Sequence, residues 1–127
     1  NGRAITGCCR PVTSGEGCKK IHRTLSEMQD LPPKVVSFSF LPRRGVNDFR
    51  PRIESGDLVF FVSTRETLDV FHTGILVWGG TGLVLRHASR SRGRVIEEEL
   101  AAFLAENHMA GVIVVRPLQP ERDSPST

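Results

Sequence analysis

The chain has 127 residues, of which 39% are hydrophobic and 24% are charged, and its formal net charge is +3. This length and composition are ordinary for one small domain with a modest core, and no apolar run approaches the length of a membrane span. The arginines are scattered, tyrosine is absent and aromatic residues make up only 6% of the chain, so we do not expect nucleic-acid binding.

The N-terminal part divides into two segments of different character. Residues 1–17 are rich in Gly, Pro, Ser and Thr and show no periodicity, which predicts a flexible leader or the stub of a connection to a missing part. Residues 19–29 are predicted to form a short helix, because Ile21, Leu25 and Met28 recur at helical spacing.

The three cysteines differ in their surroundings. Cys18 would precede the predicted helix directly, and a helix N-terminus favours the thiolate form. Cys8 and Cys9 are adjacent and lie in a stretch without a helix signal, where neighbours bridge each other only with strain. Spacing alone assigns no disulfide to this odd number of cysteines.

The middle of the chain reads as strands. Alternation predicts a strand over Val35–Leu41, and the basic stretch Pro42–Arg52 reads as a loop. The continuous apolar run Leu58–Ser63 is typical of a strand buried on both faces.

A β-hairpin follows, and it carries two histidines. Strands are predicted over His72–Trp78 and Leu83–Ser89, with a glycine-rich turn over residues 79–82. If the residues flanking this turn pair, His87 lies directly opposite Gly74. His72 is then the diagonal neighbour of His87, and the two rings can form a hydrogen bond because Gly74 has no side chain between them.

This pair gives the candidate catalytic residues, His72 and His87. A neutral imidazole takes a proton from a nucleophile best when its other ring nitrogen is held by a partner, and the second histidine can be that partner. The alternative is that each histidine is a structural residue. The chain has no spacing typical of zinc ligands, so we expect neither a metal nor another cofactor.

The C-terminal part completes the predicted fold. We expect a short strand over Arg94–Ile96, a helix over Glu97–Asn107 and a buried strand over Val112–Arg116. In the helix, Glu97 to Glu99 would occupy the first turn, where carboxylates suit the helix dipole. The fold class is therefore α+β, an antiparallel sheet of about five strands with flanking helices. It would form a single domain over residues 18–117, followed by a disordered tail over residues 118–127.

Three short motifs carry a family resemblance. GDLVFF from Gly56, HTGI from His72 and HAS from His87 resemble, in order and spacing, the NlpC-type cell-wall cysteine peptidases, which are papain-like enzymes of bacteria. The closer resemblance is to the N-acetylmuramoyl-L-alanine amidase-like domain of that superfamily. It covers about residues 35–117, the C-terminal half of such a domain and the sheet half of a papain-like fold.

The resemblance implies roles for both histidines. In that family a cysteine at a helix N-terminus is the nucleophile, the histidine that matches His72 is the general base, and the residue that matches His87 orients it. Since the nucleophile of the amidase-like family lies upstream of the matched segment, we expect a partial domain that lacks it. Alternatives are a catalytically silent fragment or binding module, and a complete thiol hydrolase that uses Cys18.

The resemblance also implies a substrate and a location. We expect an amidase or peptidase of bacterial peptidoglycan, with peptidoglycan or a muropeptide as partner, in the cell envelope or periplasm. The cluster Arg86, Arg90, Arg92 and Arg94 flanks the His87 strand. It is either a solvated loop or a rim that meets a carboxylate-bearing substrate such as a peptide stem.

Overall fold

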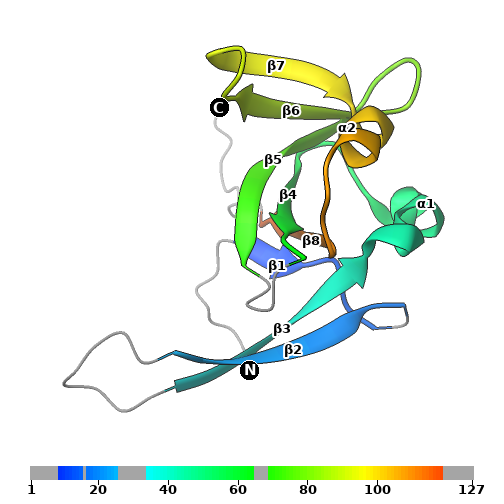
Figure 1. Ribbon diagram of the computed structural model, residues 1–127. Coiled ribbons are helices and arrows are strands. Elements are labelled where there is room, and N and C mark those ends of the chain that lie inside the picture. The colour runs from blue at the N-terminus through cyan, green and yellow to red at the C-terminus, as the bar shows by residue number, and fades with distance from the viewer. Residues whose placement is uncertain (1–8, 16, 26–33, 65–68, 119–127) are drawn as a thin grey trace, which may run out of the picture.

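The computed structural model describes residues 9–15, 17–25, 34–64 and 69–118, and Figure 1 shows their arrangement. The described residues form an antiparallel eight-stranded sheet with the order β2-β3-β8-β4-β5-β6-β7, and β1 pairs with β8 beside this path. The strands are β1 (Cys9–Pro11), β2 (Lys19–Leu25), β3 (Lys34–Pro42), β4 (Asp57–Val62), β5 (Val70–Trp78), β6 (Leu83–Ser89), β7 (Arg94–Glu99) and β8 (Gly111–Pro117). The α-helices are α1 (Val46–Phe49), flanked by single 3₁₀ turns over Arg43–Gly45 and Arg50–Arg52, and α2 (Leu100–Glu106). The α+β class is confirmed, whereas the expected count of about five strands is too low.

The last strand, β8, lies in the middle of the sheet. It pairs with β4 along one edge, and β3 and β1 share its other edge. The prediction of a flexible leader is wrong for residues 9–13, because β1 is part of the sheet and the next two residues, Val12 and Thr13, are buried. The backbone N–H of Val12 donates to the carbonyl of Val114, and Thr13 Oγ1 accepts from the N–H of Val114. Three paired residues are too few to leave a periodic pattern.

The predicted helix over residues 19–29 is also wrong. Residues 19–25 form β2, which pairs with β3 in a register that runs from Lys19 opposite Phe40 to Leu25 opposite Lys34. The β3 backbone supplies the hydrogen bonds that a helix would have made internally, and such tertiary pairing overrides a weak helical period. Residues 26–29 lie outside the described part of the chain.

The second predicted helix is shorter than expected. Residues 94–99 form β7 and pair with β6, so Glu97, Glu98 and Glu99 belong to a strand, and α2 begins only at Leu100. The stretch Pro42–Arg52, expected as a loop, holds α1 and the two 3₁₀ turns. Of the predicted tail over residues 118–127, only Leu118 lies in the described part.

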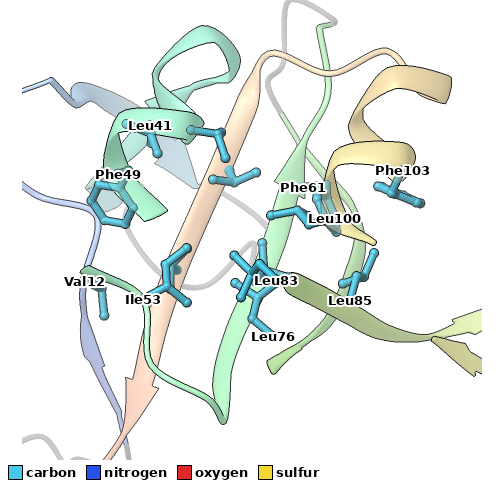
Figure 2. Packing of buried hydrophobic residues seen from close by; sticks show 14 of the residues in the cluster. Val12, Leu41, Phe49, Ile53, Phe61, Leu76, Leu83, Leu85, Leu100 and Phe103 are labelled. Carbon is cyan, nitrogen blue, oxygen red and sulfur yellow. The ribbon is translucent and has the colours of Figure 1, made fainter. Parts of the chain in front are cut away.

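One hydrophobic core lies between the helices and one face of the sheet (Figure 2). The strands contribute side chains with no exposed surface, among them Phe61, Leu76 and Leu85. The helices cover them, α1 with Phe49 and α2 with Leu100 and Phe103. His72 and His87 share this core face, because His72 lies opposite Phe61 in the register of β4 and β5 and His87 lies two residues from Leu85.

A buried ion pair fixes the two central strands. Asp57, the aspartate of the GDLVFF motif, is 1% exposed and receives two hydrogen bonds from the Arg116 guanidinium, from Nε at 2.8 Å and from Nη2 at 2.9 Å. Asp57 also accepts from the N–H of Glu54. The carboxylate of this motif therefore joins β4 to β8 and lies away from the histidines.

Candidate active site

The register of the histidine hairpin is confirmed. Strands β5 and β6 pair Ile75 with Arg86 and Trp78 with Leu83, and the next step of this register places Gly74 opposite His87. A Cβ atom on Gly74 would lie 2.6 Å from Leu85 Cδ1 and 2.9 Å from the carbonyl oxygen of Arg86. Only glycine fits between the two histidines without moving the strands.

The two imidazoles form the expected hydrogen bond. His72 Nε2 lies 2.8 Å from His87 Nδ1, and the ring planes are nearly perpendicular at 87°. His87 is 7% exposed, whereas His72 is half-buried and keeps access to solvent.

A third residue, which the sequence analysis did not find, extends this pair. His87 Nε2 lies 2.7 Å from Glu98 Oε2 in β7. His87 pairs across the strands with Ile96, so Glu98, two residues further, is its diagonal neighbour on the same face. His72, His87 and Glu98 thus form a diagonal row across three strands, which we call the relay.

The carboxylate fixes where the protons lie. An ionised carboxylate only accepts, so Nε2 of His87 must donate to Glu98. Nδ1 of a neutral His87 is then the acceptor, and His72 Nε2 donates to it. The remaining nitrogen of His72, Nδ1, carries a free lone pair and can take a proton from a nucleophile.

The surroundings keep His72 neutral. Burial lowers the pKa of His72 below 6.5, and His87 and the positive charge of Arg90 lower it further, whereas Glu98 opposes them. Phe103 of α2 stacks on the His72 ring with centroids 5.5 Å apart and meets the His87 ring at 5.2 Å. The base is therefore unprotonated at neutral pH and held by packing as well as by the relay.

A hollow of about 460 Å³ opens beside the relay. His72 and His87 line it, together with Phe71, Phe103 and Asn107. Its rim is polar and includes side chains of the turn between β6 and β7 and of α2, listed as Ser89, Arg90, Ser91, Arg92 and Glu106. A substrate group placed here would lie against the two histidines.

The sequence model of the AmiA-like family, described as N-acetylmuramoyl-L-alanine amidase-like, matches residues 12–112. The chain belongs to this family. No curated protein matches it.

Solved structures share the fold of this AmiA-like chain. An N-acetylmuramoyl-L-alanine amidase from Bacteroides uniformis superposes with a TM-score of 0.71 at 23% identity, over 90% of this chain and 59% of that one. A proposed xylanase from Bacteroides fragilis gives a TM-score of 0.64 at 23% identity, over 85% and 58%. A Legionella pneumophila protein gives 0.64 at 13% identity, over 89% and 57%. The AmiA-like chain therefore spans 57–59% of the length of these structures.

Cys18 of the AmiA-like chain is not placed as the sequence suggested. It precedes a strand rather than a helix, and it packs against the core. Burial raises the pKa of its thiol, which nearby Arg52 partly offsets. Arg52 lies over the Phe49 ring and donates to the carbonyl of Val12, and Figure 2 shows these two residues at the opposite end of the core from Phe103. Cys18 is therefore remote from the relay.

Of the two remaining cysteines, one lies in a strand and the other outside the described residues. Cys9 lies in β1 opposite Pro117, and Cys8 lies outside the described residues. No cluster of three or more His, Cys, Asp or Glu side chains that could hold a metal ion occurs in the described part of the chain. The helices described are all too short or too polar to cross a membrane.

Proposed function

We propose that this chain provides the general-base half of a thiol-dependent amidase that acts on bacterial peptidoglycan. The main support for the proposal is the relay, because it leaves Nδ1 of His72 free to accept a proton beside an open hollow. The name of the Bacteroides uniformis neighbour suggests the bond, the amide between an N-acetylmuramoyl group and L-alanine. Such a substrate would place the protein in the bacterial cell envelope or periplasm.

The chemistry follows from the proton positions. Nδ1 of His72 takes the proton of a cysteine thiol, and the thiolate attacks the carbonyl carbon of the amide. The resulting imidazolium is stabilised through His87 by the charge of Glu98. It then gives the proton to the leaving amine as the C–N bond breaks and a thioester forms. His72 next activates a water molecule, which hydrolyses the thioester and regenerates the thiol.

The thiol is proposed to come from outside the described residues. Cys18 lies at the far end of the core and its pKa is raised, which is the opposite of what a cysteine nucleophile needs. A papain-like arrangement, in which a helix brings a cysteine to His72, would supply the missing group. This is the NlpC-type assignment, and it rests here on the motifs and the relay.

The distance of Cys18 from the relay also favours a second candidate function. Without a thiol beside His72, the chain would be a catalytically silent module that binds cell-wall material through the same hollow. The two functions differ in whether amide hydrolysis occurs at all.

The test is hydrolysis of a muramoyl-L-alanine amide by this chain joined to the segment that supplies the proposed thiol, and by variants of that protein. We expect His72→Ala to abolish the reaction and Cys18→Ser, the matched thiol control, to leave it unchanged. Full activity in His72→Ala would refute the proposed base, and loss of activity in Cys18→Ser would instead identify Cys18 as the nucleophile. Binding of muropeptide without hydrolysis would favour the silent module.

A further inference from the structure

The turn between β6 and β7 presents arginines that have no acidic partner in the described part of the chain. Other arginines are paired: Arg86 contacts Glu97, and Arg116 contacts Asp57. By contrast, Arg90 and Arg92 form no ion pair with any described residue. Their charges are exposed beside the relay.

The turn holds these arginines in a defined place. The N–H of Gly93 donates to the carbonyl of Ser89 at 2.8 Å, and the N–H of Arg92 donates to Ser89 Oγ at 3.2 Å. Gly93 adopts a φ of 66°, which favours glycine and closes the turn. The chain direction at Arg90 is therefore set by the end of the strand that carries His87.

Two observations place Arg90 close to the base. Arg90 and Arg92 line the same hollow as His72 and His87. The positive charge of Arg90 also lowers the pKa of His72, which requires proximity. Arg90 follows His87 by three residues, which is about 10 Å of extended chain, and an arginine side chain can reach back over much of that length.

The acidic side chains around the hollow do not neutralise these arginines. Glu98 is engaged with His87, and Glu97 with Arg86. Glu106 lies on the rim from α2 and makes no ion pair with a described residue. An anion entering the hollow would therefore meet free guanidinium groups on the β6–β7 side.

We propose that Arg90, with Arg92 beside it, binds a carboxylate of the substrate that lies one or two residues from the scissile amide. The inference rests on the proposed function and names the substrate class, a short peptide with a free carboxylate. His72 and Arg90 line the same hollow, so a short peptide with its amide at His72 would bring a nearby carboxylate to Arg90. A guanidinium suits this task because it can bind both carboxylate oxygens.

Binding of such a carboxylate would also act on the base. The ligand charge would offset the field of Arg90 at His72, so the pKa of His72 would rise when the substrate binds. The charged and titratable groups of the described chain that surround His72 and its hollows are Arg90, Arg92, Arg94, His87, Glu97, Glu98 and Glu106.

The test compares two ligands by nuclear magnetic resonance. A muramoyl dipeptide with a free terminal carboxylate and its terminal amide are titrated into the chain, and the affinity and the pKa of His72 are measured. We expect the free acid to bind about fivefold more tightly than the amide, since a single exposed ion pair contributes little more. We also expect only the free acid to raise the pKa of His72.

Arg90→Gln should remove both differences. Arg44→Gln is the matched control, because it removes the same charge from an exposed position on another hollow, between α1 and α2. Equal binding of acid and amide, no binding of the acid, or a preference that survives in Arg90→Gln would overturn the proposal. Hydrolysis without a preference for the free acid would overturn this inference alone, whereas preferential binding without hydrolysis would count against the proposed amidase only.

Discussion

Replacement of Glu98 by glutamine is the sharpest test of the relay. Glu98→Gln keeps the shape of the side chain and removes its charge. The carboxylate can only accept a hydrogen bond from His87 Nε2, whereas an amide can also turn its NH₂ group toward that nitrogen. In the turned state His87 would carry its proton on Nδ1 and donate to His72 Nε2. His72 would then carry its own proton on Nδ1, where the base needs a lone pair.

The size of the effect follows from the hydrogen bond that is weakened. A hydrogen bond to a charged group contributes about 1.5–3 kcal/mol and a neutral one about 0.5–1.5 kcal/mol. Since the Glu98 side chain is 28% exposed, we take the low end of both ranges, a difference of about 1 kcal/mol, which is about fivefold in the preference for the productive tautomers. The amidase rate should fall at least as much, because the imidazolium formed on His72 also loses its counter-charge.

The assay is nitrogen-15 resonance of the imidazoles near neutral pH. In the parent chain His72 and His87 should both be protonated on Nε2, and in Glu98→Gln the Nδ1-protonated forms should appear. Loss of the Glu98 charge should also lower the pKa of His72, because that charge raises it. Glu99→Gln is the control, since Glu99 is exposed, contacts Thr81 and carries the same charge one position along the strand. Protonation of His72 on Nδ1 in the parent chain, or unchanged tautomers in Glu98→Gln, would refute the reasoning.

Three further predictions concern the frame around the relay. Gly74→Ala should lower the free energy of unfolding by about 1–3 kcal/mol and break the hydrogen bond between the two histidines, because the new methyl group overlaps its neighbours. Gly80→Ala is the control and should do neither, because a Cβ atom there has nothing within 4 Å. Chemical denaturation measures the stability, and the histidine resonances report the hydrogen bond. Asp57→Asn should lower the free energy of unfolding by about 3 kcal/mol, since it leaves the Arg116 guanidinium, only 17% exposed, with the exposed Glu54 as its one remaining acidic partner among the described residues; an unchanged denaturation midpoint would contradict this. The pKa of His72 is lower in the folded chain than its ordinary value of 6.5, so the unfolded chain takes up the proton first as the pH falls. The free energy of unfolding should therefore decrease as the pH drops below about 6.5. In His72→Gln, urea unfolding should show a smaller decrease over the same pH range.

The histidine pair was predictable because a short hairpin fixes its own register. A turn of four residues between two alternating strands leaves little freedom, so Gly74 follows opposite His87 and His72 follows diagonally. The buried strands β4 and β8 were predictable for a similar reason, since their apolar runs have no other place than a core.

The structures of residues 19–25 and of β1 depend on pairing between segments that are distant in the sequence. Residues 19–25 carry a helical period, but their partner in β3 decides their structure, and nothing local reveals that pairing. The short strand β1 follows only once β8 offers a free edge. Cys18 was misjudged as a consequence, because its supposed helix N-terminus does not exist.

Glu98 was missed although a signal was present. Consecutive glutamates before an apolar segment suit a helix N-terminus, so the sequence predicts all three of them in the first turn of a helix. The Ser91–Gly93 turn sets the register of a third strand in the same way as the glycine-rich turn sets that of β5 and β6. This register places Ile96 opposite His87 and Glu98 at the diagonal position, as the structure shows.

The junction between β7 and α2 explains why the relay and its cover belong together. Glu98 ends the diagonal row, and only five residues later Phe103 of α2 stacks on the His72 ring and meets the His87 ring edge-on. A shift of β7 by one residue would turn Glu98 to the other face of the sheet and move the start of α2 with it. One register, that of β7 on β6, therefore sets both the position of the carboxylate and the burial that lowers the pKa of His72. A change that disturbs either should alter the pKa of His72.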